Sequence, residues 1–176
     1  GMQMCLILVT GFAVAASKPV SWSLHALANL PRTGAQGVLL IAFTAATLGI
    51  LHWGLGLIGG AILARDVTRA LKKRGVTVHA PLIAAAGYPG LLVWHGGFSG
   101  SAPLKMTSAA EVASVFPAGV EATPLPLSET LLSPLNLVAT LGLVVIAPLL
   151  FMLMSPKQGN QPETHEPERP TTMPAD

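Results

Sequence analysis

Charged residues are scarce in this chain, and their scarcity excludes most soluble folds. Hydrophobic residues make up 51% of its 176 residues and charged residues only 10%, whereas a soluble domain carries roughly a quarter charged residues. The formal net charge of +2 at pH 7 is too small for a nucleic-acid-binding surface. These proportions predict an all-α integral membrane protein embedded in a lipid bilayer, with no nucleic-acid partner.

Cysteine is nearly absent as well. Cys5 is the only one and lies within an apolar run, so neither a disulfide framework nor a thiolate metal site is available. The five histidines have no short ligand spacing to one another, which makes metal binding the least favoured of their uses. We therefore expect no metal and no resident cofactor.

Long apolar runs are what the chain has in abundance, at residues 2–16, 38–64, 80–94 and 135–154. A helix needs about 20 residues to cross roughly 30 Å of hydrocarbon. A signal peptide has basic residues before its apolar run, and the first run has none. We therefore interpret this run as a helix cut at its front. The last run fits one span. Residues 156–176 have little to bury, which predicts a disordered polar tail after a membrane domain at 1–155.

The second run is longer than one span and allows two topologies. A single tilted helix would place its flanking loops on opposite sides of the membrane. Positive charge lies on both sides of the run, with Lys18 and Arg32 before it and a basic cluster after it, as expected of two cytoplasmic loops. We therefore favour a re-entrant helical hairpin at 37–64, with half-span arms and its tip at 52–56.

That interpretation orients the rest of the chain. Loops 18–34 and 65–79 and the C-terminal tail would be cytoplasmic. The third run, too short alone, would enter the membrane at residue 80, break around residues 95–101 and emerge outside at about residue 104. In hydrocarbon every freed amide and carbonyl needs a partner, so a discontinuous helix at 80–104 predicts a binding site at the break.

Two enzyme motifs are present only in part. Residues 54–59 match G-x-G-x-x-G, yet the dinucleotide fingerprint requires a preceding strand in a βαβ unit. Residues 97–101 come close to the nucleophile elbow G-x-S-x-G, but Ser101 stands where glycine is required and no Asp is placed to complete a triad. A membrane-embedded serine hydrolase using His95 and Ser99 is therefore the least favoured function, and we predict no enzyme.

The two interruptions could meet and form one site. Ser99 and Ser101, with exposed backbone amides of Gly96, Gly97 and Gly100, would make an oxyanion cradle, because half-helix N-termini carry free N–H groups that bind carboxylates. Only Lys105 is basic nearby. A singly charged, mostly apolar substrate therefore fits better than a dicarboxylate or a phosphate.

The predicted site has two walls, and each residue also has a purely structural interpretation. The glycines could pack helices, the tryptophans could pack or anchor at the interface, and the imidazoles could bond freed backbone. The predicted substrate-binding residues are His52, Trp53, Gly54 and Gly56 at the tip, and Trp94, His95, Gly96, Gly97, Phe98, Ser99, Gly100 and Ser101 at the break.

These motifs are similar to those of a known family. Residues 1–4, 8–11, 52–57, 64–65 and 97–101, followed by Pro103-Leu104, resemble the bacterial short-chain fatty acid transporters, and the likeness covers most of residues 1–155. Two positions depart from the family: His52 stands where Asn is typical, and His95 where a small residue is common.

The resemblance implies a multi-pass secondary transporter of the bacterial inner membrane for butyrate, acetate, acetoacetate and related monocarboxylates, with Na⁺ or H⁺ as the coupling ion. It also implies one half of an inverted-repeat fold, because family members are more than twice this length and contain a second Gly-rich, Ser-containing motif. The missing second half would then be a partner. The alternative is a truncated, non-transporting membrane fragment or assembly module.

Overall fold

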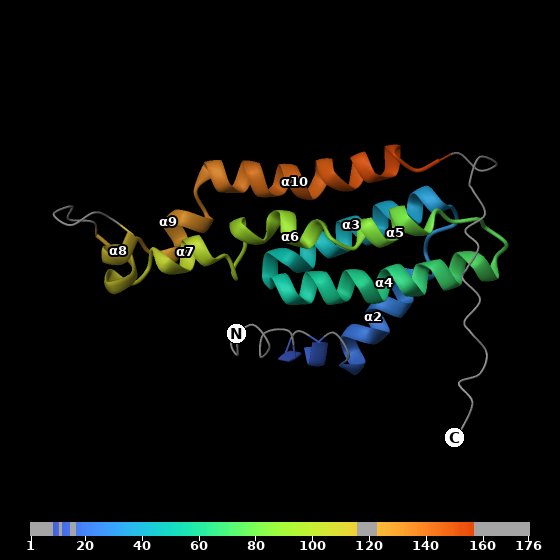
Figure 1. Ribbon diagram of the computed structural model, residues 1–176, viewed down its shortest axis with the longest axis horizontal. Helices are drawn as coiled ribbons and strands as arrows, with labels where there is room; N and C mark the ends of the chain where they lie inside the picture. The colour runs from blue at the N-terminus through green and yellow to red at the C-terminus, as the bar shows by residue number, and fades with distance from the viewer. Residues whose placement is uncertain (1–8, 11, 15–16, 116–122, 157–176) are drawn as a thin grey trace, which may run out of the picture.

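The computed structural model of the protein describes residues 9–10, 12–14, 17–115 and 123–156. Within these residues the chain is helical, with no β-strand, which confirms the all-α class. Figure 1 shows three layers: α10 lies over a middle layer of α3, α5 and α6, and α4 lies on the other side of that layer, crossed by α2.

Helices α3 (Gly34–Leu51) and α4 (Trp53–Lys73) form an antiparallel hairpin. His52, with extended backbone angles of φ −157° and ψ 127°, ends one helix and begins the next. Gly56 lies against Gly49 and Gly60 against Ala45, the pairing expected when two helices run in opposite directions. A single helix through residues 37–64 is therefore not formed.

The hairpin is longer than predicted. Its arms have 18 and 21 residues, not the half-spans expected within residues 37–64, because α4 continues through the basic cluster. Val67 and Leu71 are fully buried there, whereas Arg65, Arg69 and Lys72 are exposed. One face of this segment packs against the core, so the helix continues while its other face carries the charge.

The expected loops at 18–34 and 65–79 are accordingly wrong in part. Lys18–Ala28 forms helix α2, and the connection after α4 is confined to residues 74–79. Gly75, the second residue of that connection, has a φ of +73°, which glycine adopts without steric cost. The Val76 amide bonds the Leu71 carbonyl and the Gly75 amide the Lys72 carbonyl, which is a Schellman ending.

Residues 80–105 are interrupted twice. They form α5 (Ala80–Ala86), α6 (Pro89–Val93), the 3₁₀ turn η1 (Trp94–Gly96) and α7 (Ser101–Lys105). The non-helical residues 97–100, called the break below, lie where an interruption was expected. The earlier one at 87–88 was not expected, although Pro89 has no amide with which to continue α5.

The remaining helices are α8 (Ala109–Val115), α9 (Leu127–Leu131) and α10 (Pro134–Leu153). Helix α10 covers nearly the residues expected of a span at 135–154. Ser133 caps it by accepting from the Asn136 amide at 3.3 Å, and Pro134 occupies the first turn, where no amide donor is needed. Residues 9–10 and 12–14 of the expected first helix are helical; its other residues, and the tail at 157–176, lie outside the described residues.

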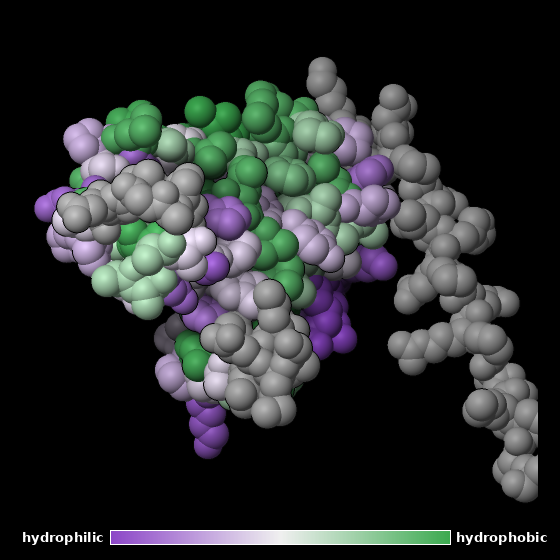
Figure 2. Space-filling model, turned by 60° about the vertical axis from the view of Figure 1, so that its left-hand side comes forward, coloured by the Kyte–Doolittle hydropathy of each residue, from purple (hydrophilic) through white to green (hydrophobic). Residues whose placement is uncertain are grey.

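Two helices of the described residues, α3 and α10, are long and apolar enough to cross a membrane. Helix α10 turns much of its apolar surface outward: Leu135 is 82% exposed and Val138 74%. Figure 2 shows hydrophobic side chains gathered along the upper side of the molecule, where α10 lies in Figure 1. A continuous apolar surface of this kind indicates contact with lipid, and the protein is a membrane protein.

Candidate functional site

The hairpin joint at His52 and the break meet in the folded protein. The Trp53 amide donates to Ser99 Oγ at 3.1 Å, across 46 residues of sequence. The Phe98 amide donates to the Ile50 carbonyl at 2.8 Å. Two segments that each lose helical hydrogen bonds therefore satisfy one another, as buried backbone requires.

The N-terminus of α4 is the centre of this contact. Helix N-termini carry unpaired amides and partial positive charge. Here the Gly54 amide donates to Nδ1 of His52 at 3.2 Å, and the Trp53 amide is held by Ser99. Both acceptors are uncharged side-chain atoms. These contacts bring no negative charge to the N-terminus of α4, and the first turn of α4 contains no acidic residue.

A row of rings lies beside the helix start. The ring centroids of His52 and Trp53 are 6.1 Å apart, those of Trp53 and Trp94 6.0 Å, and those of Trp94 and His95 4.3 Å. Nε1 of Trp94 donates to the Ser99 carbonyl at 2.7 Å, which orients the break against the row. These rings form an apolar wall next to the first amides of α4.

Two amides of the predicted oxyanion cradle, those of Gly97 and Gly100, are already paired in this structure. The Gly97 amide donates to the Trp94 carbonyl and the Gly100 amide to the Gly97 carbonyl, both at 3.0 Å, and both glycines are buried. A Cβ at Gly97 would collide with the Ile50 backbone. These glycines allow a tight turn and a close approach of two backbones, so their amides are not left for a ligand.

The structure divides the predicted site residues into three groups. His52, Trp53, Gly54, Trp94 and Ser99 come together at the start of α4. Gly56 packs against Gly49 and Gly90, and Gly96, Gly97 and Gly100 also serve close packing. The exposed members of the set are His95, Phe98 and Ser101.

Side chains of α10 hold the residues next to the break in place, which was not predicted from the sequence. Nδ2 of Asn136 donates to the Gly96 carbonyl at 3.0 Å and to the Leu131 carbonyl at 2.9 Å, and Thr140 Oγ1 donates to Asn136 Oδ1 at 3.3 Å. Gly96 lies so close to these two side chains that a Cβ would collide with both. The available signal was an Asn and a Thr four residues apart, on one face of an otherwise apolar helix.

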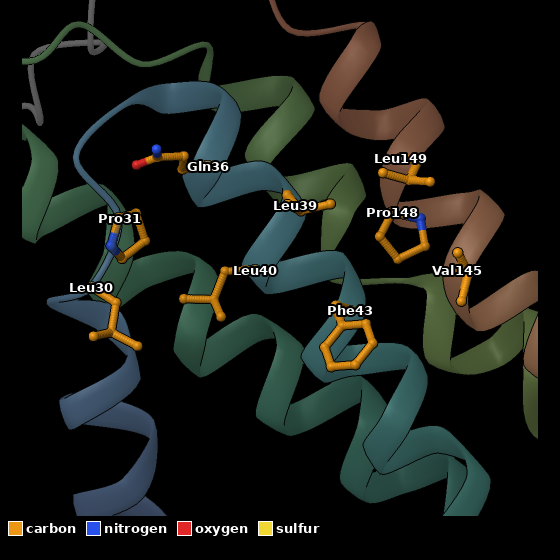
Figure 3. A pocket seen from close by; sticks show the side chains of 9 residues that line it. All are labelled: Leu30, Pro31, Gln36, Leu39, Leu40, Phe43, Val145, Pro148 and Leu149. Carbon is orange, nitrogen blue, oxygen red and sulfur yellow. The ribbon is translucent and has the colours of Figure 1, made fainter.

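A cavity of about 520 Å³ lies elsewhere, between α3 and α10. Figure 3 shows Leu40 and Phe43 of α3 opposite Val145, Pro148 and Leu149 of α10, with Gln36 at one end. No residue of the predicted site lines it. Its walls are almost entirely apolar, so it offers no partner for a carboxylate.

The contacts of the site can be compared with two other hypotheses, a serine hydrolase and a metal site. Ser99 Oγ contacts a backbone amide rather than an imidazole that could activate it. Among the described residues, no group of three or more His, Cys, Asp or Glu side chains could hold a metal ion.

Interrupted helices that meet the start of another helix occur in many solute transporters. The family model described as short chain fatty acid transporter matches residues 1–167. The chain belongs to this family, whose name indicates transport rather than catalysis.

Two curated relatives carry the same description, "Putative short-chain fatty acid transporter". The protein from Escherichia coli K12 is 39% identical over 157 residues, covering 89% of this chain and 34% of the relative. The protein from Haemophilus influenzae is 40% identical over 165 residues, covering 90% and 35%. The chain thus spans about a third of the length of these relatives. No solved structure matches it.

Proposed function

We propose that the protein takes up short-chain monocarboxylates such as butyrate, acetate and acetoacetate across the bacterial inner membrane. Family membership supports the substrate class. The start of α4, where two amides are held only by the neutral acceptors Ser99 Oγ and His52 Nδ1, is the observation that carries the proposal. One negative charge suits such a site, since no cation needs to accompany it.

The chemistry of binding follows from these contacts. Ser99 Oγ accepts from the Trp53 amide, so its O–H remains to donate to a carboxylate oxygen. The second carboxylate oxygen takes the place of His52 Nδ1 at the Gly54 amide. The rings of Trp53 and Trp94 then lie beside a short alkyl chain. No covalent step is involved, and movement of the break against α4 would alternate access to the two sides.

The length of α4 supports a tip inside the membrane, whereas α3 alone is long and apolar enough to cross it. The uncharged part of α4, residues 53–64, is only about 18 Å long at 1.5 Å per residue, well short of the roughly 30 Å hydrocarbon core. Nη1 and Nη2 of Arg74 donate to the carbonyls of Pro31 and Asn29, each at 2.8 Å. The connections before α3 and after α4 therefore lie together, as two cytoplasmic connections would.

The opposite wall of the site would come from outside this chain. In the inverted-repeat arrangement that we propose, a second half with its own interrupted helix faces the break, and H⁺ or Na⁺ supplies the driving force. The chain's coverage of about a third of its relatives fits a site completed by further sequence.

Uptake of radiolabelled butyrate by proteoliposomes tests the function, with the protein expressed from its complete reading frame and with H⁺ and Na⁺ gradients applied separately. Ser99→Ala removes one hydrogen bond to a charged group, worth about 1.5–3 kcal/mol, and we expect the half-saturating butyrate concentration to rise at least about tenfold. Ser128→Ala, an exposed serine of α9, is the matched control. Wild-type liposomes that accumulate no butyrate would contradict the function, and an unchanged Ser99→Ala would contradict the site.

A further inference from the structure

A buried carboxylate lies at the basic end of α4. The side chain of Asp66 is only 7% exposed. Nε of Arg65 donates to its Oδ1 at 3.3 Å, and Nη1 of Arg69 lies 4.0 Å from the same oxygen. Oδ2, by contrast, makes no hydrogen bond. An ionised oxygen in a buried position is costly unless it is hydrogen-bonded.

His25 of α2 faces that unpaired oxygen. Its Nε2 lies 3.3 Å from Asp66 Oδ2, and its Nδ1 lies 2.6 Å from the Ser21 carbonyl. A carbonyl can only accept, so Nδ1 carries a hydrogen. In the neutral imidazole Nε2 is then a bare acceptor, and two acceptors face each other. One added proton, on either atom, replaces the two facing acceptors by a donor and an acceptor 3.3 Å apart, between α2 and α4.

Two other histidines show that this arrangement is particular to His25. Nδ1 of His52 accepts from the Gly54 amide, and Nδ1 of His79 accepts from the Leu82 amide, each at 3.2 Å. In both rings Nδ1 is the acceptor that caps a helix. His25 instead has a carbonyl at one nitrogen and a carboxylate oxygen at the other.

We propose that His25 and Asp66 form a binding site for a single proton that joins α2 to α4. A cavity of about 260 Å³, lined by His25, Asn29, Asp66, Arg69 and Lys73 among others, opens onto the pair. The imidazole is 60% exposed, so protons reach Oδ2 from water through the ring.

The surrounding charges favour a proton over a metal cation. Arg65 and Arg69 of α4 approach the carboxylate from the Oδ1 side, and Lys73 lines the cavity. On the α2 side, His25 is the titratable group that lines the cavity, while Arg74 is engaged with the Pro31 and Asn29 carbonyls. A metal ion would meet these positive charges, and only one carboxylate oxygen is left to bind it.

The pair is separate from the substrate site. It lies about 20 Å along α4 from Trp53, at 1.5 Å per residue. Binding of the proton adds a hydrogen bond that holds α2 on α4, and its release leaves two facing acceptors. The site is therefore tested without butyrate, and its failure would leave the proposed transport untouched.

Nuclear magnetic resonance of the full chain in lipid nanodiscs, with ¹⁵N-labelled histidine and ¹³C-labelled aspartate, tests the proposal. Across a pH series we expect the His25 Nε2 and Asp66 Cγ signals to change together in one step, because they report one shared proton. Asp66→Asn places an amide donor opposite Nε2, so this shared step should be lost. The His52 and His79 signals are internal controls and should not respond to the substitution.

Separate, uncorrelated changes of the two wild-type signals would overturn the proposal. So would a His25 ring whose neutral form carries its hydrogen on Nε2. If Asp66→Asn does not fold, His25→Asn provides the second variant. It keeps the carboxylate and removes the imidazole, and an Asp66 signal that then titrates as in the wild type would also overturn the pair.

Discussion

The two ends of α4 are surrounded by different kinds of groups. At its start, near Trp53, backbone amides are held by neutral acceptors and flanked by glycines and indole rings. At its other end, from Arg65 to Arg74, exposed cations surround one buried carboxylate. The helix dipole favours anions at the first end and cations at the second. The end without fixed charge is the one at which we propose that the anionic substrate binds.

The comparison also separates the forces that hold each end. Near the hairpin joint, helices approach closely through glycines, and the hydrogen bonds of the Trp53 and Gly54 amides are partly buried. At the basic end the hydrogen bonds involve charged groups that water can reach. Substitutions at the joint should therefore cost more than substitutions at the basic end.

The largest effect is expected at Gly49. A Cβ there would collide with the backbone of Gly90 on α6, so Gly49→Val should force α3 and α6 apart and destabilise the fold by about 3 kcal/mol or more. Thermal unfolding in detergent measures this loss. Gly142→Val on α10 is the control, because a Cβ at Gly142 meets no atom within 4 Å. If both variants lost the same free energy of unfolding, close packing at Gly49 would not be what makes the joint sensitive to substitution.

A smaller effect is expected at Asn136. Removing its side chain leaves the Gly96 carbonyl without the donor that the structure provides, and an unpaired carbonyl in apolar surroundings costs about 1–3 kcal/mol. Asn136→Ala should lower the unfolding temperature and loosen the break, which hydrogen exchange at the Phe98 amide would detect. Val138→Ala, at an exposed position on the same helix, should change neither. Unaltered exchange at Phe98 would mean that α10 does not support the break.

The smallest effect is expected at Arg74. Arg74→Ala removes two hydrogen bonds to the carbonyls that precede α3, but water can replace the donors, so we expect a loss of about 1 kcal/mol. Chemical unfolding in detergent compares it with Lys72→Ala, an exposed neighbour. A loss at Arg74 larger than that at Asn136 would reverse the proposed difference between the two ends.

Much of the outline could be predicted from residue patterns. The apolar runs, the interruption at His52 and the break after Trp94 follow from Gly, Pro and polar residues within bilayer-length apolar sequence, and the quoted motifs identified the family. The basic cluster was misassigned to a loop, because charge alone does not separate a loop from the exposed face of a helix. Burial of Val67 and Leu71 decided that question.

By itself, the sequence determined that this chain is a helical membrane protein of the short-chain fatty acid transporter family, with two interruptions, because composition and local backbone preferences are short-range properties. Only the tertiary structure decided which freed groups pair: Ser99 with Trp53, Asn136 with Gly96, and His25 with Asp66. These partners lie about 40 or more residues apart. Their pairing depends on helix packing that brings specific atoms within hydrogen-bonding distance, which no local pattern encodes.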